Sequence, residues 1–334
     1  MHDIRLALGL IGFLSLGIFL GLRRLLKTAH PRVLDACAVG LLLLMAAYVK
    51  YVWGELWIVN WIPLPSVIIL SNWFPLLLSA LGAVVCIRMG GDRNDLPADD
   101  DVEIAAAEII NASVSIAGEP DDRRLSIDQY LIIRRTVMMA MIIGAATYSV
   151  LSFIPLTAPE CRDEWAAPPQ PPLVWPVCLQ TNPNTCSAAS SATILYTLGI
   201  QTTEQEMAKL CLTRNGTTWL GLYHGLSSKL LGTKHTVEFF ESDTTNLFGL
   251  AQKHPLLLCC KLSSDAAQDA PEYVTQGGWK PGTAHSVVYF GQVNGRHVIG
   301  DPSRGYEIWS DQDLAILWTR EGLKITDIRP TNAG

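Results

Sequence analysis

One cysteine has the surroundings of a nucleophile. Cys186 follows the turn-forming run 181–184 and opens an apolar stretch, 185–196, that is predicted to be a helix. A helix N-terminus lowers a thiol's pKa, because its dipole and free backbone N–H groups stabilise the thiolate that attacks a carbonyl. Gln180, six residues earlier, could donate its side-chain amide to the resulting oxyanion. Taken alone, the pair of Gln180 and Cys186 is a weak signal, and a buried structural thiol is the more common role of such a cysteine.

A histidine and an aspartate supply the remaining groups. His285 opens an apolar strand, 285–292, and Asp301 ends the next one, 297–301. The turn residues at 294–295 predict a hairpin between the two strands. The carboxylate would then lie beside the imidazole, accept its N–H and set its tautomer. Either residue alone would be read as a core histidine or a turn aspartate, but the order of all four favours a catalytic set of Cys186, His285, Asp301 and Gln180.

The elements that must position this set are helices first and strands later. Two more helices are expected at 203–212 and 220–231; the first has Thr202 or Thr203 as its cap and acids in its first turn. The strand-like runs are 236–241, 255–262, 285–292 and 297–301. Helices followed by an antiparallel sheet predict an α+β fold.

With these residues in place, 174–323 resembles the bacteriocin-processing peptidases, cysteine peptidases of the papain-like clan that remove double-glycine leaders from secreted peptides. The resemblance rests on four stretches: Gln180 to Cys186 with Ala188 and Ala189, Gly216 to Leu222, His285 to Gly291, and Asp301 to Gly305. It implies a papain-like domain in which Gln180 holds the oxyanion, Cys186 is the nucleophile, His285 the acid and base, and Asp301 its orienting partner.

The sequence departs from that family at one position. The family usually has glycine directly after the nucleophile, and this chain has Ser187. A side chain there would narrow the oxyanion pocket. Family members fused to exporters act in the cytoplasm, so their double-glycine specificity does not transfer automatically to this chain.

The first half of the chain is strongly apolar. The whole chain is 49% hydrophobic and 17% charged, a bias that several lipid-embedded helices produce. We expect an all-α region of four transmembrane helices at 4–22, 34–53, 66–87 and 136–156. A buried helix of a soluble protein is the alternative for any one of them, and a cleaved signal peptide is an alternative for the first.

Basic residues orient these spans. They flank the first loop, as Arg23, Arg24, Lys27 and Arg32, and the third, as Arg88, Arg93, Arg123, Arg124, Arg134 and Arg135. Positively charged loops remain in the cytoplasm, so the part of the chain after Leu156 is predicted to lie outside the cell membrane. The acidic third loop, 89–133, is expected to be a solvated cytoplasmic excursion, with partner docking as the alternative.

These patterns divide the chain into three parts. Residues 1–157 form the transmembrane region, 158–172 a linker too rich in proline for a helix, and 173–334 the peptidase-like domain. The linker is expected to be extended and semi-rigid.

No cofactor or metal is expected. The net charge of −6 gives no basic footprint for nucleic acid, and without a Gly-rich loop ending in Lys and Ser or Thr no nucleotide-binding domain is predicted. Zinc is disfavoured because no Cys-x-x-Cys pair occurs and because four histidines lack ligand spacing: His224, His235, His254 and His297. Disulfides are possible outside the cytoplasm between Cys161, Cys178, Cys211, Cys259 and Cys260, with no pairing indicated.

The expected partners are a peptide or protein substrate and the lipid bilayer. The leading functional hypothesis is hydrolysis of peptide bonds by a membrane-anchored cysteine peptidase. Two alternatives stay open. The same residues could serve another acyl transfer, such as transglutamination or amide hydrolysis, or the domain could be an inactive peptide-binding receptor.

Overall fold

A computed structural model describes residues 2–90, 132, 136, 143, 158–169 and 175–328. Two compact units emerge from it. One contains the described residues of 8–50 and 72–150, and the other contains the described residues of 1–7, 51–71 and 151–334. The first unit is helical, and the second holds the sheet and the helices that cover it.

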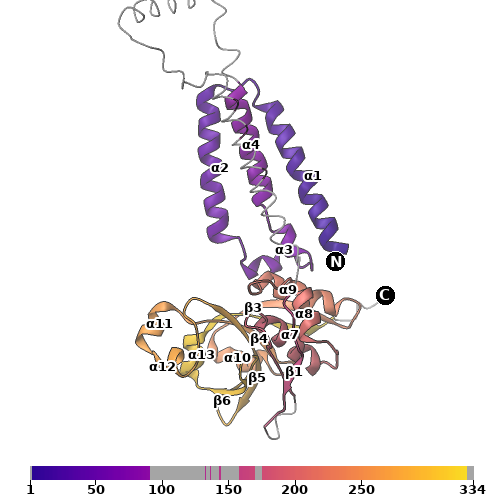
Figure 1. Cartoon of the computed structure of the whole chain (residues 1–334), viewed down its shortest axis with the longest axis vertical. Coiled ribbons are helices and arrows are strands. Elements are labelled where there is room, and N and C mark those ends of the chain that lie inside the picture. The colour runs from indigo at the N-terminus through magenta and orange to yellow at the C-terminus, as the bar shows by residue number, and fades with distance from the viewer. Residues whose placement is uncertain are drawn as a thin grey trace, which may run out of the picture. The chain divides into compact units, whose positions relative to one another are not determined.

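Long apolar helices dominate the first half of the chain (Figure 1): α1 (His2–Leu25), α2 (Pro31–Tyr51) and α4 (Phe74–Gly90). The described side chains of α4, 74–88, are buried or half-buried, but large apolar side chains of α1 and α2 point outward, with Phe13 73% and Leu43 67% exposed. A soluble helix would bury such a surface. Three stretches are long and apolar enough to cross a membrane: Ile4–Leu25, Pro31–Tyr51 and Val67–Arg88. The predicted fourth span and the acidic loop lie almost wholly outside the described residues.

An unbroken helix was expected from the sequence for the third stretch, but the structure has two helices there. The stretch consists of a short helix, α3 (Val67–Leu70), and then α4, which restarts at Phe74. Pro75 explains the interruption: proline lacks an N–H and is tolerated only in the first turn of a helix, so it fits just after a new start. Near the other end of α4, Arg88 Nε contacts Asp35 Oδ1 of α2 at 3.0 Å.

A six-stranded antiparallel sheet forms the centre of the second unit. Its strands follow the order β3-β8-β4-β5-β6-β7, so the last strand of the chain is inserted between β3 and β4. Their bounds are β3 (His235–Glu241), β4 (Leu256–Lys261), β5 (Ala284–Val293), β6 (Arg296–Asp301), β7 (Gly305–Trp309) and β8 (Trp318–Asp327). The prediction of an antiparallel sheet following helices is confirmed.

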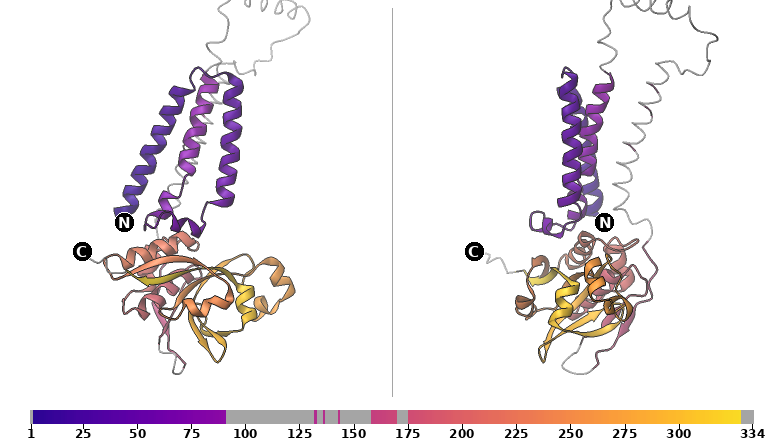
Figure 2. Two further views of the ribbon diagram at one scale, coloured as in Figure 1. Left: turned by 180° about the vertical axis from the view of Figure 1, so that it is seen from behind. Right: turned by 90° about the vertical axis from the view of Figure 1, so that its left-hand side faces the viewer.

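Three helices precede the sheet in the chain and lie together beside it (Figures 1 and 2): α7 (Cys186–Thr197), α8 (Glu204–Leu210) and α9 (Trp219–Leu230). All three were predicted to within a few residues because their ends carry local signals. Thr203 and Thr218 cap the starts of α8 and α9 by accepting hydrogen bonds from backbone N–H groups. Gly199, with φ of +73°, ends the first of them.

The two faces of the sheet pack differently. Along β5, Ser286 faces α7, to which it is hydrogen-bonded. Its neighbours alternate to the other face, where Val287 and Tyr289 join a fully buried core. That core is completed by α10 (Thr244–Leu250) and α13 (Asp311–Leu317). Two further short helices, α11 (Ser264–Asp269) and α12 (Glu272–Thr275), lie in the connection between β4 and β5.

A small sheet and a short helix complete the second unit. Strand β1 (Glu164–Ala166) pairs with β2 (Val177–Leu179), so part of the predicted linker is a strand. The 3₁₀-helix η1 (Leu56–Asn60) packs against β3 and α9.

Candidate active site

The first turn of α7 carries the candidate nucleophile. Cys186 is the first residue of this helix, and Thr185 precedes it as the N-cap residue. The apolar face of α7 is buried against the sheet and the neighbouring helices, which fixes the helix start. The thiol is therefore held where free backbone N–H groups stabilise a thiolate.

A buried carboxylate braces the loop before Cys186. The Glu204 side chain, 0% exposed, accepts hydrogen bonds from Thr181 N at 2.9 Å and Thr181 Oγ1 at 2.7 Å. It also accepts one from Thr185 Oγ1 at 2.5 Å. Glu204 was noted in the sequence only as a first-turn acid of α8. Its bracing role depends on contacts between separate segments, which no local pattern reveals.

The hairpin of β5 and β6 brings His285 and Asp301 together. Val288 pairs with Gly300, so Asp301 lies next to Val287 and diagonal to His285 on the same face. Diagonal neighbours are within reach of long side chains. The Asn294 and Gly295 turn that closes the hairpin has positive φ at both residues, +52° and +73°, as a type I′ turn requires.

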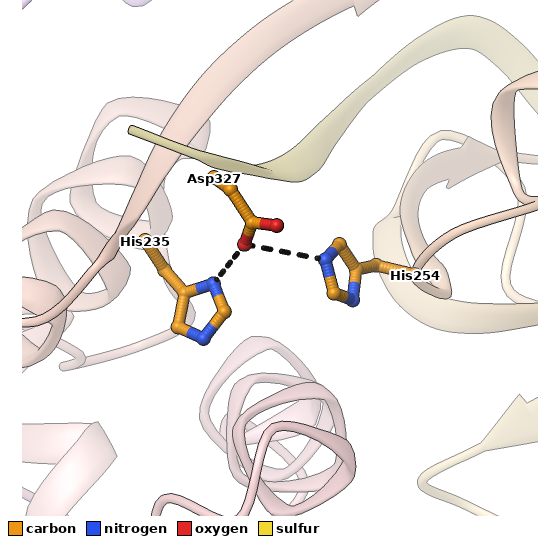
Figure 3. A group of neighbouring side chains, drawn as sticks. All are labelled: His235, His254 and Asp327. Atoms are coloured by element: carbon orange, nitrogen blue, oxygen red, sulfur yellow. Dashed lines mark ion pairs between the residues drawn. The ribbon is translucent and has the colours of Figure 1, made fainter. Parts of the chain in front are cut away.

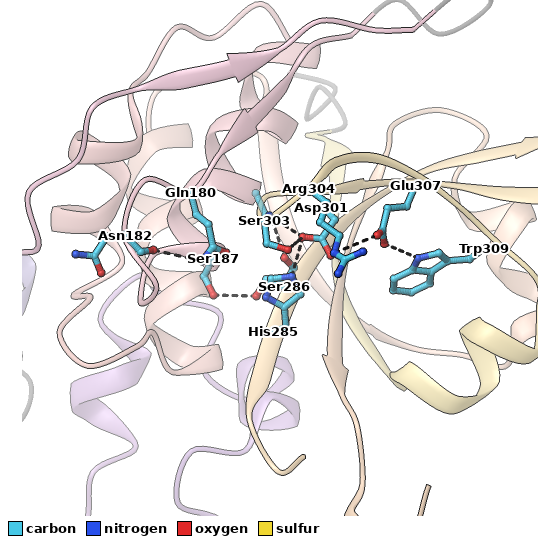
Figure 4. A network of polar contacts seen from close by, with 11 residues as sticks. Gln180, Asn182, Ser187, His285, Ser286, Asp301, Ser303, Arg304, Glu307 and Trp309 are labelled. Carbon is cyan, nitrogen blue, oxygen red and sulfur yellow. Dashed lines mark hydrogen bonds and ion pairs between the residues drawn. The ribbon is translucent and has the colours of Figure 1, made fainter. Parts of the chain in front are cut away.

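Asp301 holds the imidazole firmly (Figure 4). Its Oδ1, on a side chain 3% exposed, accepts from His285 Nε2 at 3.0 Å. The same oxygen accepts from Ser303 N at 2.7 Å and Ser303 Oγ at 2.6 Å. Because Nε2 is used, Nδ1 is the ring nitrogen left for Cys186.

Cys186 and His285 are electrostatically coupled. Burial alone would raise the pKa of the Cys186 thiol, but its hydrogen bond to His285 and the charge of the imidazolium lower that pKa below its ordinary value. Burial would likewise lower the pKa of His285, yet hydrogen bonds with Asp301 and Cys186 raise it to about 10. Burial raises the pKa of Asp301, and the hydrogen bond from His285 more than offsets this, so the pKa ends below its ordinary range. These shifts favour a thiolate and imidazolium pair.

Two serines of α7 lock the helix to β5. Ser187 Oγ lies 2.8 Å from Ser286 Oγ, and Ser190 Oγ donates to Ser286 O at 2.8 Å. The hydroxyl of Ser187, the residue directly after Cys186, is therefore engaged with the sheet. Its contact places the start of α7 against the strand that carries His285.

Gln180 lies just after β2 and lines the same cavity as Cys186, His285 and Asp301. Its backbone N–H donates to Pro302 O at 2.7 Å, which ties it to the turn after Asp301. Its side-chain Nε2 donates to Asn182 O at 3.3 Å, a long bond, and its Oε1 is buried without a hydrogen-bond partner. The side-chain amide of Gln180 is therefore held by one long hydrogen bond and lies on the cavity that Cys186 and His285 also line.

The surface is hollowed on both sides of Cys186. A cavity of about 420 Å³ is lined by the 214–219 loop and Ser187. A second, of about 360 Å³, is lined by Gln180, His285 and Asp301 together with the 277–280 loop. Cys186 contributes to both, so an extended chain could pass across the thiol.

Solved structures provide a comparison for this arrangement. The chain is similar to the peptidase domain of Streptococcus ComA, a bi-functional ABC transporter involved in a quorum sensing pathway, at 19% identity and a TM-score of 0.35, covering 45% of this chain and 96% of that one. It is similar to the peptidase domain of Streptococcus mutans ComA, at 18% identity and a TM-score of 0.29, covering 45% and 98%. A double-glycine-motif protease from an AMS/PCAT transporter, in complex with its leader peptide, matches at 15% identity and a TM-score of 0.34, covering 49% and 99%.

All three are peptidase domains. No family model and no curated protein matches the sequence.

Trp279 is a site residue that the sequence analysis missed. Its ring packs edge-on against His285, with centroids 5.3 Å apart and planes at 89°, and it also contacts Trp309. The indole ring therefore covers part of the imidazole, whose side chain remains 17% exposed. The signal available was a Gly-Gly-Trp run, 277–279, in the loop just before His285. Arg304 Nη2 fixes that loop by donating to Gln276 O at 2.8 Å.

The other cysteines provide a contrast. All eight cysteines lie in the described ranges and are free. Burial raises the pKa of Cys211 to about 12 and that of Cys161 to about 11. The adjacent thiols of Cys259 and Cys260 are completely buried, and burial raises the pKa of both well above the usual value. Of the six thiols with a resolved shift, only Cys186 is shifted towards the thiolate.

Proposed function

We propose that this protein is a membrane-anchored, papain-like cysteine peptidase whose catalytic residues are Cys186, His285, Asp301 and Gln180. The observation that carries the proposal is the coupled site: a thiol at a helix start, a histidine beside it, and a buried aspartate bonded to the far side of the imidazole. A structural cysteine requires none of these partners.

In the acylation step, the Cys186 thiolate attacks the carbonyl carbon of the scissile peptide bond. The oxygen becomes an oxyanion, which accepts hydrogen bonds from Gln180 Nε2 and the backbone N–H at the start of α7. The His285 imidazolium then gives its Nδ1 proton to the amine nitrogen as the C–N bond breaks. The amine leaves, and the acyl group remains on sulfur as a thioester.

Water completes the reaction. Neutral His285 takes a proton from water, whose oxygen attacks the thioester carbonyl through a second oxyanion. The C–S bond breaks, and the carboxylic acid and the Cys186 thiolate are released with the imidazolium restored. Asp301 stays ionised throughout and keeps Nε2–H directed at itself, so that Nδ1 faces the substrate.

The decisive experiment uses the full chain in detergent with a library of peptides and a thiol-directed activity probe. We expect peptide cleavage and probe labelling that Cys186→Ala removes. Cys161→Ala is the matched control, because Cys161 is part-exposed in the same unit, and it should leave both signals intact. Cleavage that survives Cys186→Ala, or no cleavage by a folded wild-type chain across the library, would refute the peptidase assignment.

A further inference from the structure

Three side chains of metal-binding type meet away from the candidate active site (Figure 3). His235 is the first residue of β3, Asp327 is the last of β8, and His254 lies just before β4. His235 and Asp327 are directly opposed in the β3–β8 pairing, which places their side chains on the same face. Their potential ligand atoms all lie within 4.8 Å of one another.

The geometry converges on one carboxylate oxygen. Asp327 Oδ1 is 2.8 Å from His235 Nδ1 and 3.7 Å from His254 Nε2. The two imidazole rings meet edge to face, with centroids 5.7 Å apart. Lys253 Nζ binds the other oxygen, Asp327 Oδ2, so Oδ1 alone faces the two rings.

The three atoms that face one another are buried and have no hydrogen-bond partner: His235 Nδ1, His254 Nε2 and Asp327 Oδ1. His235 is 8% exposed, so solvent does little to satisfy it. The short His235 to Asp327 contact is an ion pair without hydrogen-bond geometry. Buried polar atoms are normally satisfied, and a group of unsatisfied ones points to an absent ion or water.

Other buried histidines of this unit behave differently. His224 Nδ1 lies 2.7 Å from Leu210 O, and its Nε2 lies 3.4 Å from Ser228 Oγ. His297 Nδ1 contacts Tyr289 OH at 3.2 Å, and its Nε2 contacts Asp311 Oδ1 at 2.8 Å. Both nitrogens of each ring are therefore engaged, as structural histidines require. His235 and His254 do not fit that pattern.

We propose that His235, His254 and Asp327 form a site for a divalent transition-metal ion, best suited to Zn²⁺, that ties together β3, β8 and the entry to β4. Two imidazole nitrogens and one carboxylate oxygen are ligands that Zn²⁺ accepts, with a fourth position open to water. In tetrahedral zinc the ligand atoms are about 3.3 Å apart, which follows from bonds of about 2.0 Å. Small side-chain rotations reach that spacing from the distances above.

The expected role of the ion is structural. Cys260 pairs with His285 at the active-site end of β4, and His254 precedes the other end of that strand. The strand residues from Leu256 to Cys260 lie between them, a span of about 13 Å. A bound ion therefore stabilises the fold by binding the native state without touching the reacting groups.

The test is a zinc titration of the metal-free full chain in detergent, followed by thermal unfolding. A Cys186→Ala background removes zinc binding to the reactive thiol. We expect one zinc per chain and a rise in Tm of about 5 °C at saturation. His254→Ala and Asp327→Asn should abolish the rise in Tm. Asparagine has nearly the same shape as aspartate, so the Asp327→Asn variant should still fold. His30→Ala, an exposed histidine outside the cluster, should keep it.

Cobalt gives an independent readout, because four-coordinate Co²⁺ with nitrogen and oxygen ligands has absorption bands in the visible range. We expect these bands in the Cys186→Ala background and their loss in the His254→Ala and Asp327→Asn variants. A zinc-dependent Tm rise that is unchanged by His254→Ala, or no rise and no cobalt bands in the folded background protein, would overturn the proposal. Neither result would bear on peptide cleavage by the wild-type thiol.

Discussion

At the scale of residues, one hydrogen-bonded chain distinguishes Cys186 from the other thiols. Asp301 bonds to His285, and His285 in turn lowers the pKa of the Cys186 thiol. The completely buried thiols lack such a partner, and their pKa values rise. Reactivity here is a property of neighbours, so removing a neighbour should alter it in a defined direction.

The first prediction concerns pH. Alkylation of Cys186 requires only the thiolate, and because His285 lowers the thiol pKa, alkylation should persist at mildly acidic pH, well below the usual thiol pKa of about 8.5. Peptide turnover also needs the imidazolium, which loses its proton as pH rises through about 10. We therefore expect kcat/KM to fall near pH 10 while alkylation continues.

His285→Ala provides the matched comparison. It removes the group that lowers the pKa of the Cys186 thiol most, leaving only the hydrogen bonds with Ser286 and Ser187 against the effect of burial. The alkylation profile should therefore shift to higher pH, and turnover should vanish. Parallel measurements of alkylation rate and thermal stability separate this from unfolding. A wild-type thiol that titrates near its ordinary pKa would contradict the coupled pair.

The second prediction concerns Gln180. Gln180→Ala should lower turnover by about a hundredfold or more, the usual cost of one oxyanion donor, while Cys186 still accepts the activity probe. Gln252→Ala removes an amide from the turn after α10, where it donates to Phe248 O, and should change neither signal. Unchanged turnover in Gln180→Ala would remove this residue from the site.

At the scale of elements, α8 and α9 hold α7 and its preceding loop in place. Glu204, the first residue of α8, binds Thr181 and Thr185 of that loop. Gly225 of α9 lies close to Cys211, the residue that ends α8. A Cβ added at Gly225 would lie 2.3 Å from Cys211 Sγ. These contacts connect catalytic geometry to helix packing.

The third prediction replaces the buried carboxylate. Glu204→Gln keeps the shape of the side chain but replaces the carboxylate that accepts hydrogen bonds from Thr181 and Thr185 with a neutral amide. We expect a loss of about 1–3 kcal/mol in unfolding free energy together with lower turnover. Glu206→Gln is the control on the same helix, because Glu206 is half-exposed and pairs with Lys229; it should cost less than about 1 kcal/mol. Equal effects of the two substitutions would argue against a bracing role for Glu204.

The fourth prediction tests the close approach of α8 and α9. Gly225→Ala should destabilise by about 1–3 kcal/mol because the new methyl group collides with a well-packed neighbour. Gly249→Ala, in α10, meets nothing within 4 Å and should stabilise slightly, since alanine favours a helix over glycine. Thermal unfolding of both variants measures these effects. A Gly225→Ala variant as stable as wild type would show that α8 and α9 separate more easily than the structure implies.

At the scale of the whole molecule, apolar helices and a candidate peptidase unit occur in one chain. The first two candidate spans, Ile4–Leu25 and Pro31–Tyr51, expose large apolar side chains such as Phe13 and Leu43, a surface that is stable only in an apolar surrounding. The basic residues of the loops favour placing the peptidase unit outside the cytoplasm.

The fifth prediction is therefore topological. A reporter enzyme fused after Gly334 should be active only when it is extracytoplasmic, and protease added to intact cells should release the C-terminal unit. A second reporter inserted in the first loop, after Lys27, should report the cytoplasm. Cytoplasmic activity of the C-terminal fusion would reverse the orientation and place any substrate inside the cell.

The sequence by itself determined those features whose signals are local. Apolar runs, the cap at the start of α8, Gly199, and the hairpin turn at 294–295 all act within a few residues of themselves. Four spans, three helices and the β5–β6 hairpin were therefore predicted, and three of the spans fall on candidate spans of the described residues. The types of the candidate catalytic residues were also visible. Their order along the chain suggested a chemistry, because helix starts and strand ends place side chains in known directions.

Only the tertiary structure decided the contacts between distant segments. Ser187 meets Ser286, Trp279 covers His285, and the last strand is inserted between β3 and β4. Two of the four histidines that lack ligand spacing in the sequence, His235 and His254, meet Asp327 for the same reason. Spacing along the chain describes one segment, whereas the three side chains come from three segments. Long-range pairing depends on the packing of the entire core, and that packing is a sum over many residues that no local pattern contains.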